Sequence, residues 1–228
     1  MRRGGGSRAI RVLAAAAAAV LLALAIAQLV LPRIAASRIS SKIGRYGEVA
    51  DVSVSAWPAV ELLWGHADSV TVRARRLALS PARAAALLWE ARGTGSLDVH
   101  AEAVRLGSLA LSGATLRKRG ASLAATATTT DAQARAALPA GVSVRLLGSS
   151  GGSVEVLAAG SLFGVGVGVR TIARPSDGEL VAAPASPLLE AFKLTLFADP
   201  HVYVLGVGAR VVSRSPLTYS LALSGRLR

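Results

Sequence analysis

The chain of 228 residues contains no cysteine, and aromatic residues make up only 4% of it. The absence of cysteine excludes disulfide bonds, zinc–thiolate sites and thiol catalysis. With so few large rings, the core must be built from the Ala, Val and Leu that dominate a hydrophobic content of 52%. Glycine occupies 23 positions. Small side chains of this kind suit strands that pack closely together.

Acidic residues are also few, at 13 against 26 Lys and Arg, so the formal net charge is +13. Four arginines lie in the first eleven residues, which leaves 22 basic against 13 acidic residues in the rest of the chain. Such an excess favours an anionic partner, and an anionic lipid surface attracts each nearby basic residue by roughly 1 kcal/mol. No nucleic-acid partner is expected, because the arginines are scattered along the chain and stacking rings are scarce.

The first long apolar segment is residues 12–31, in which Gln28 is the one polar side chain. An α-helix needs about 20 apolar residues to cross a bilayer, so we predict a transmembrane helix and signal anchor here. The arginines favour a cytoplasmic N-terminus at residues 1–11 and place residues 32–228 outside the membrane as one exported domain. Ala25-Ile26-Ala27 also resembles a cleavage site, and cleavage would give a secreted protein instead.

Few segments of the exported part are typical of helices. Residues 34–43 carry apolar side chains at helical spacing. Ser80 is a good N-cap for a helix that Gly93 ends, and Thr130 with Gln133 forms a capping box that opens a short helix. Most of the remaining sequence alternates apolar and polar residues, as half-buried strands do.

The alternating segments predict an α+β fold. In this fold an N-terminal transmembrane helix precedes a long, curved, mainly antiparallel sheet that packs on a few short helices. Residues 217–227 give the clearest strand. Residues 68–79 alternate as well, but the apolar phase shifts after Arg75 and Arg76, which predicts a bulge or a break of the strand at that point.

No motif of the chain is typical of catalysis. The three histidines, His66, His100 and His201, belong to no metal-ligand spacing, and no nucleophile elbow is present. The glycine-rich segment at residues 164–168 lacks the third glycine and the lysine of phosphate-binding loops. We therefore expect neither enzyme activity nor a metal or cofactor. Alternate glycines in a strand leave one face bare, so protein or an acyl chain can approach it closely.

Trp57 and Trp64 lie on a short amphipathic helix that the spacing of Trp57, Val60 and Trp64 before Gly65 predicts, and Trp89 lies on the helix that Ser80 begins. Rings of this size either anchor a core or contact lipid at a groove mouth or membrane interface. The sequence leaves both alternatives open.

A series of short motifs runs through nearly the whole exported part. They are AASRI at 35–39, DVSV at 51–54, WP at 57–58, LLWG at 62–65, DSVTV at 68–72, LRKRG at 116–120 and RAALP at 135–139. With the glycine-rich strands that close the chain, these motifs resemble the LmeA family of phospholipid-binding proteins of actinobacterial envelopes. The helical segment from Ser80 to Gly93 departs from the family pattern, in which a strand would continue.

The resemblance implies a non-enzymatic domain that holds a phospholipid and supports envelope and lipoglycan assembly. With the basic charge and the N-terminal segment, we expect an anionic phospholipid bound at the outer face of the cytoplasmic membrane. It also implies a sheet wrapped around helices, similar to tubular lipid-binding folds. The alternative is a structural envelope protein that docks an acidic partner or polymer and has no lipid cavity. We expect the lipid site to be lined by Trp57, Trp64, Val70, Val72, Phe163, Val165, Val167, Phe197 and Tyr203. Arg73, Arg75 and Arg76 are expected to form the rim that binds the head group.

Overall fold

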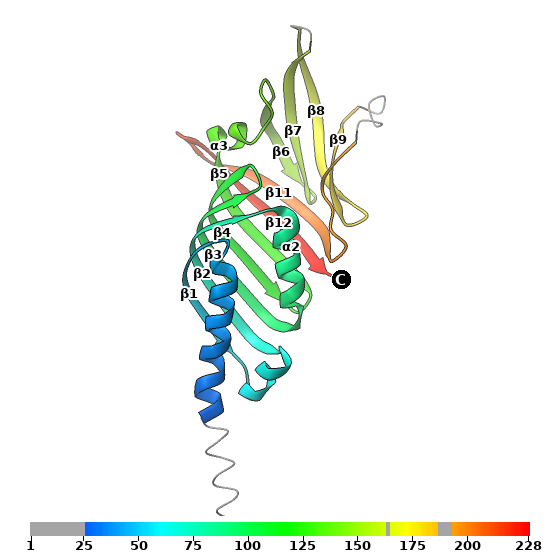
Figure 1. Ribbon diagram of the computed structural model, residues 1–228. Coiled ribbons are helices and arrows are strands. Elements are labelled where there is room, and N and C mark those ends of the chain that lie inside the picture. The colour runs from blue at the N-terminus through cyan, green and yellow to red at the C-terminus, as the bar shows by residue number, and fades with distance from the viewer. Residues whose placement is uncertain (1–25, 163–164, 187–192) are drawn as a thin grey trace, which may run out of the picture.

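The computed structural model describes residues 26–162, 165–186 and 193–228. Strands hold 62% of these residues and helices 22%, and the strands form two separate sheets (Figure 1). The predicted α+β fold with one long sheet is therefore wrong, since the chain is mainly β. The difference arises because strands β6 to β10 form a sheet of their own, after which the chain returns to the first sheet with its last two strands.

The first sheet has seven strands, which alternate apolar and polar faces. Their order is β1 (Gly47–Ser55), β2 (Ala67–Leu79), β3 (Thr94–Leu106), β4 (Leu109–Arg119), β5 (Ser122–Thr130), β12 (Leu217–Leu227) and β11 (Val202–Arg214). All neighbours are antiparallel except β2 and β3, which are parallel. On β2 the register skips Arg75 between Ala74 and Arg76, so the predicted bulge is confirmed.

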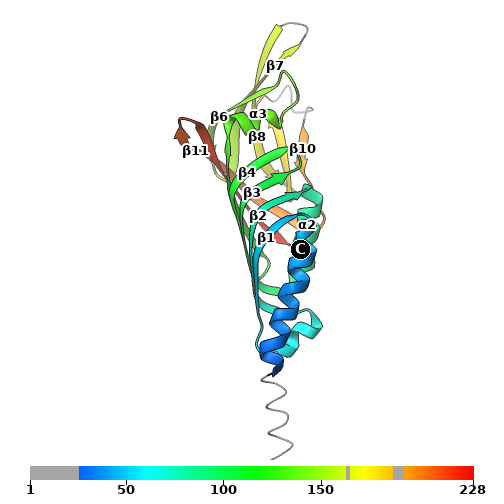
Figure 2. The ribbon, with the colours of Figure 1, turned by 60° about the vertical axis from the view of Figure 1, so that its left-hand side comes forward.

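The second sheet is an antiparallel meander of five strands. Their order is β10 (Leu194–Phe197), β9 (Glu179–Pro184), β8 (Val165–Ser176), β7 (Ser153–Leu162) and β6 (Ser143–Ser150). In Figures 1 and 2 this sheet lies at the end of the molecule opposite the start of the N-terminal helix. The molecule is elongated as a result.

The helices cover one face of the first sheet only. The described part of the N-terminal helix spans residues 26–44. It is followed by η1 (Ala59–Trp64), α2 (Pro81–Glu90), η2 (Ala91–Gly93) and α3 (Asp131–Ala136). Parallel strands require a crossover connection, and α2 is that connection between β2 and β3. Figure 2 shows α2 and the N-terminal helix on the same side of the sheet.

Side-chain caps fix where two of these helices begin. The Oγ atom of Ser80 accepts a hydrogen bond of 3.2 Å from the backbone N–H of Arg83. Thr130 and Gln133 exchange the two hydrogen bonds of a capping box at the start of α3. Both predicted helix starts are confirmed.

The packed core lies beneath the helices. Ala35, Ile39 and Ile43 of the N-terminal helix pack against a buried cluster on β1, β2 and β3. Ala85 of α2 is buried with Leu123 and with the end strands β11 and β12. The predicted apolar face of residues 34–43 is confirmed, although the helix begins earlier and runs without interruption through Pro32.

The predicted transmembrane helix falls mostly on residues 12–25, which are outside the described residues. Within the described part of the chain, no helix is both long enough and apolar enough to cross a membrane.

A buried lysine links the helical layer to the sheet. The side chain of Lys118 on β4 is fully buried and donates hydrogen bonds to the backbone carbonyls of Thr94 and Arg92, the latter at 3.3 Å. Burial lowers the pKa of this lysine. Its ammonium group satisfies carbonyls at the C-terminal end of η2, where helices leave such groups unpaired.

The second sheet is attached to the first through the free edge of β11. The backbone N–H groups of Val204 and Val207 donate to the carbonyls of Gly178 and Gly152, each at 2.8 Å. These two acceptors lie at the tips of the β8–β9 and β6–β7 hairpins. Gly178 has φ of 88° and lies against the Tyr203 ring, so an added Cβ would overlap the ring. The junction therefore depends on backbone contacts and on small residues.

We expect the substitution Gly178→Ala to weaken this junction, because Cβ would clash with Tyr203 and the backbone conformation is left-handed. Gly120→Ala is the matched control, since Gly120 has φ of 56° but no atom within 4 Å of an added Cβ. Urea unfolding should show a loss of about 1 kcal/mol for the control and about 2–4 kcal/mol for Gly178→Ala. Equal losses in both variants would contradict the close packing at the junction.

Candidate functional site

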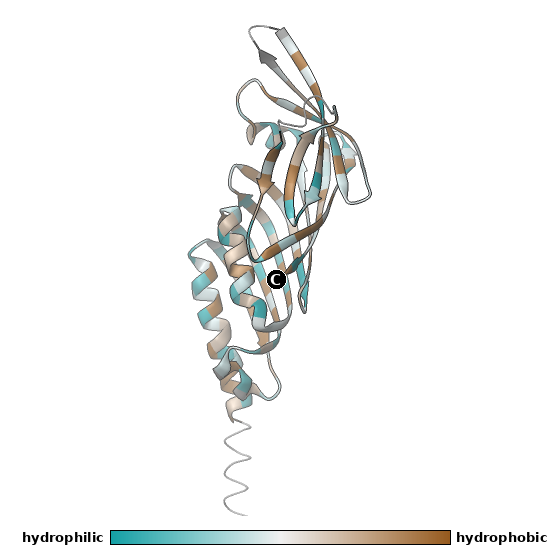
Figure 3. Ribbon diagram, turned by 90° about the vertical axis from the view of Figure 1, so that its right-hand side faces the viewer, coloured by the Kyte–Doolittle hydropathy of each residue, from teal (hydrophilic) through white to brown (hydrophobic). Residues whose placement is uncertain are grey.

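One face of the second sheet carries apolar side chains on every strand. The strand register sets them side by side in rows across the sheet. The rows, in which Thr171 is the polar member and Gly160 has no side chain, are Gly160 and Val167; Val144, Ala158 and Val169; Leu146, Val156, Thr171 and Pro184; and Val154, Ala173, Ala182 and Leu194. We call these residues the apolar face. Figure 3 shows hydrophobic residues recurring along these strands.

No residue of the apolar face is buried in the isolated chain. Val167 is 45% exposed and Leu194 is 62% exposed, and the other members are half-buried. By contrast, Val181 and Ala183 on the opposite face of the same sheet are buried. An exposed contiguous apolar surface marks a site of binding to a protein, membrane or ligand. Such a surface is well suited to the acyl chains of a lipid.

The first sheet continues the apolar lining beyond its helices. A row of partly buried side chains runs across β3, β4, β5, β12 and β11 on the face that carries the helices, from the core cluster beneath the N-terminal helix to the edge strand β11. It consists of Val99, Leu116, Ala125, Leu223 and Val207. At the edge of this sheet, Leu205 and Val211 of β11 are about half exposed, at 53% and 47%. Apolar surface thus remains open on both sheets near their junction.

A cavity of about 310 Å³ lies where β6 and β7 face β12 and α3. Leu157, Ala159 and Leu217 form an apolar wall, while the guanidinium groups of Arg135 and Arg145 supply positive charge. We call this cavity the basic pocket. A wall of this kind beside two guanidinium groups can accommodate an amphiphile with a phosphate group, which arginine binds with paired hydrogen bonds.

The two arginines of the basic pocket differ in their partners. Arg135 forms an ion pair of 2.8 Å with Asp131, which also accepts a 3.3 Å hydrogen bond from the hydroxyl of Tyr219. Burial raises the pKa of Tyr219, and the negative charge of Asp131 raises it further. Tyr219 therefore stays a donor. Arg145 is exposed and makes no ion pair within the described residues, so its charge is available to a ligand.

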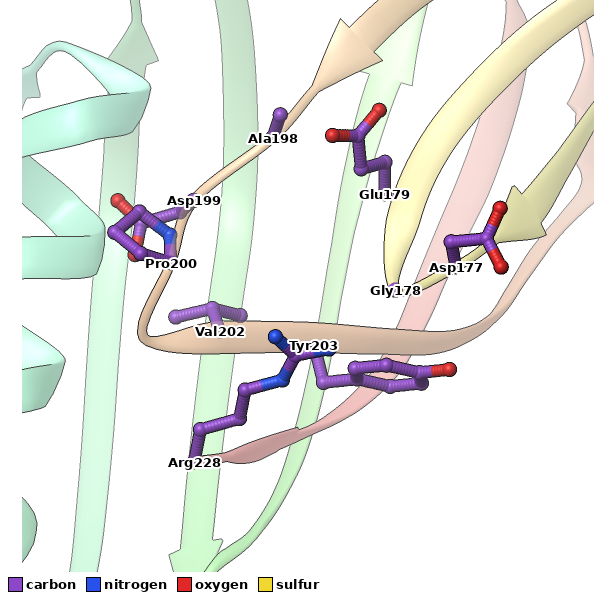
Figure 4. Close-up of a pocket in the computed structure, with 9 residues that line it drawn as sticks. All are labelled: Asp177, Gly178, Glu179, Ala198, Asp199, Pro200, Val202, Tyr203 and Arg228. Atoms are coloured by element: carbon purple, nitrogen blue, oxygen red, sulfur yellow. The ribbon is translucent and has the colours of Figure 1, made fainter.

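A second cavity, also of about 310 Å³, lies between the β8–β9 hairpin and the loop before β11 (Figure 4). Asp177, Glu179 and Asp199 surround it, and Arg228 is its one basic side chain. The guanidinium of Arg228 lies 4.8 Å from the centre of the Tyr203 ring. Three carboxylates would repel a phosphate, so this cavity is the poorer match for an anionic head group.

Strand β6 connects the apolar face with the basic pocket. Because neighbouring residues of a strand point to opposite faces, Val144 and Leu146 lie on the apolar face while Arg145 lies on the other side. β6 is the last strand of its sheet, so its outer edge is unpaired. A single amphiphile could lie around this edge with its chains on one side and its phosphate on the other.

The residues predicted from sequence to line the lipid site do not come together. Val70 and Val72 are core residues beneath the N-terminal helix, and Phe197 packs near the buried cluster around α2. Trp57 and Trp64 are exposed at the other end of the molecule. Of the predicted set, Val167 lies on the apolar face. Phe163 is outside the described residues, and Val165 lies in β8 beside Val167.

Tyr203 and the predicted head-group rim lie elsewhere. Tyr203 packs against Gly178 and lines the second cavity, which the three carboxylates surround. Arg73, Arg75 and Arg76 are exposed on β2, and Arg75 pairs with Glu48 at 2.6 Å. The hydrogen bond and charge of Glu48 raise the pKa of Arg75. The binding roles given to these residues stay predictions.

Sequence reasoning did not single out β6, β7 or the two arginines of the basic pocket. Residues 142–147 and 154–158 alternate along much of their length, but a strand that faces a lipid alternates just as one that faces a core does. The glycines of β8 give no signal for the apolar face either, because Gly166 and Gly168 lie on the opposite face of the strand from Val167.

An uncovered apolar face beside a basic pocket defines the class of proteins that bind amphiphilic ligands. The model of the LmeA-like phospholipid-binding family matches residues 22–218. The chain therefore belongs to this family, and the resemblance seen in its short motifs is confirmed. No curated protein and no solved structure matches the chain significantly.

If the apolar face is uncovered, a hydroxyl group placed on it should cost little. We expect Val156→Thr on β7 to lower the free energy of unfolding by less than about 1 kcal/mol in lipid-free protein. Val72→Thr is the matched change in the core, where Val72 is 1% exposed, and it should cost about 1–3 kcal/mol. Urea unfolding of both variants checks this. A cost at Val156 as large as at Val72 would show that the face is packed.

Proposed function

We propose that this protein binds an anionic phospholipid without chemically altering it, at the outer face of the cytoplasmic membrane, and supports assembly of the cell envelope and its lipoglycans. The uncovered apolar face of the second sheet is the observation that carries the proposal. Membership of a phospholipid-binding family supports it. In this proposal the acyl chains lie on the apolar face and the phosphate lies in the basic pocket.

The energetics of such binding follow from burial of apolar surface. Covering the apolar face removes both the side chains and the acyl chains from water, at about 25 cal/mol per Å² of apolar surface. Each methylene buried contributes about 0.8 kcal/mol. The acyl chains would thus supply most of the affinity, while the head group would determine which lipid is bound.

The preference for an anionic lipid rests on charge. Beyond residue 11 the chain carries 22 basic against 13 acidic residues, and the guanidinium of Arg145, which forms no ion pair among the described residues, lies beside the apolar wall of the basic pocket. The outer-face location rests on the sequence of the N-terminal region alone, where arginines precede an apolar segment that directs export. Envelope assembly is the role that the family resemblance implies.

A structural protein that docks an acidic polymer is the second candidate. The basic charge favours it, since an acidic polymer would satisfy the same arginines. It gives no reason for an apolar face to remain uncovered. The two candidates differ in whether purified protein carries lipid.

Native mass spectrometry of the full chain, purified from a bacterial membrane fraction, tests the proposal. We expect phospholipid in stoichiometric amount, displaced by added phosphatidylglycerol more readily than by phosphatidylcholine. Arg145→Gln should lower this preference about tenfold, because a hydrogen bond to a charged group is worth about 1.5–3 kcal/mol. Arg73→Gln is the matched control, since Arg73 is also an exposed arginine on a strand but lies outside the basic pocket.

The outcomes separate the two candidates. The proposal is supported if the purified protein carries lipid, and if the preference for phosphatidylglycerol is lost in Arg145→Gln and kept in Arg73→Gln. Protein that carries no lipid and takes none from liposomes contradicts the proposal and favours the structural protein. An equal effect of both substitutions would assign the preference to overall charge instead of the basic pocket.

A further inference from the structure

The two most exposed large hydrophobic side chains of the described residues are tryptophans at the two ends of one short segment. Trp57 is 77% exposed and precedes η1, and Trp64 is 71% exposed and ends it. Neither ring packs into the core. We infer that η1, with Trp57 and Trp64, is a wedge that inserts its rings into the interfacial layer of an anionic phospholipid bilayer.

The backbone around the two rings is held in place. The backbone N–H of Trp57 donates a 2.7 Å hydrogen bond to the Asp68 carboxylate. Ala56 and Ala59 are buried, and Leu62 packs against the core cluster. The rings are therefore presented by a fixed scaffold, so little conformational entropy is lost when they insert.

A second apolar surface lies at the same end of the molecule. Ile26, Leu29, Val30 and Ile34 share one face of the N-terminal helix and are 44–67% exposed. Figures 1 and 2 both place η1 beside the start of this helix, at the end opposite the second sheet. Two stretches of exposed apolar surface among the described residues, the η1 tryptophans and this helix face, thus lie at one end.

The chemistry of these residues favours a bilayer over other partners. Tryptophan concentrates at the boundary between head groups and acyl chains, because its ring is apolar and its N–H can still find a hydrogen-bond acceptor. Arg33 and Arg38 are exposed on the nearby helix, where they can meet lipid phosphates. The wedge and the apolar face are separate surfaces at opposite ends. The wedge would bind the membrane at one end of the protein, so the second sheet at the opposite end would lie away from the bilayer.

The inference rests on the proposed function only in that both require a membrane beside the protein. The test uses full-length protein bound to vesicles of phosphatidylcholine and phosphatidylglycerol whose acyl chains carry bromine near the head groups, with bound protein recovered by flotation. Bromine quenches tryptophan emission only at short range. Trp89 serves as the internal control, because it lies on α2 and stacks on His201 with ring centres 4.4 Å apart.

Wild-type protein should lose much of its emission on brominated vesicles compared with unbrominated ones. The double variant Trp57→Phe/Trp64→Phe, which keeps Trp89, should show no such loss, and each single variant should show an intermediate loss. Both substitutions are at exposed positions, and circular dichroism checks that the variants fold.

Equal quenching of wild-type protein and the double variant would overturn the wedge, as would protein that fails to float with the vesicles. If η1 binds another protein instead, the rings of Trp57 and Trp64 stay outside the bilayer, and wild-type protein loses no more emission than the double variant. If quenching fails while lipid is still bound in native mass spectrometry, only the wedge is lost. If quenching occurs but no lipid is carried, the proposed function is lost and the wedge remains.

Discussion

The packing of two helices on one end of the first sheet is the constraint on which the rest of the structure depends. The parallel pairing of β2 and β3 requires a crossover, and the crossover helix α2 lies on the same face as the N-terminal helix. Together they bury Val70, Val72 and Leu97. Among the described residues, no further long helix covers the rest of the apolar surface of the first sheet. A second sheet lies at that end of the molecule instead of a helix.

That second sheet is attached in a way that leaves one of its faces open. Its hairpin tips bind the free edge of β11 through backbone hydrogen bonds, and Gly178 makes the close approach to Tyr203 possible. Attachment by the tips avoids a face-to-face sandwich, in which the apolar rows would interdigitate and disappear from the surface. The chain therefore stays folded while much apolar area remains exposed, a cost that a bound lipid would offset.

Local features of the fold were predictable from the sequence, whereas the arrangement of the strands was not. The caps at Ser80 and Thr130, the bulge at Arg75 and the apolar face of the N-terminal helix depend on neighbouring residues, and all are confirmed. The division into two sheets depends on which distant strands pair, and alternation carries no information on pairing. The same limit means that alternation alone does not show that the N-terminal helix packs on the cluster of Val70 and Val72.

Photolabelling gives the most direct test of the claim that lipid occupies the apolar face. Protein loaded with a phospholipid that carries a photoactivatable group in its acyl chain would be separated from vesicles, illuminated and mapped by peptide mass spectrometry. The account predicts labels on strands β6–β10 that excess unlabelled lipid removes. Labels confined to the strands beneath the helices, or labels that excess lipid does not remove, would contradict it.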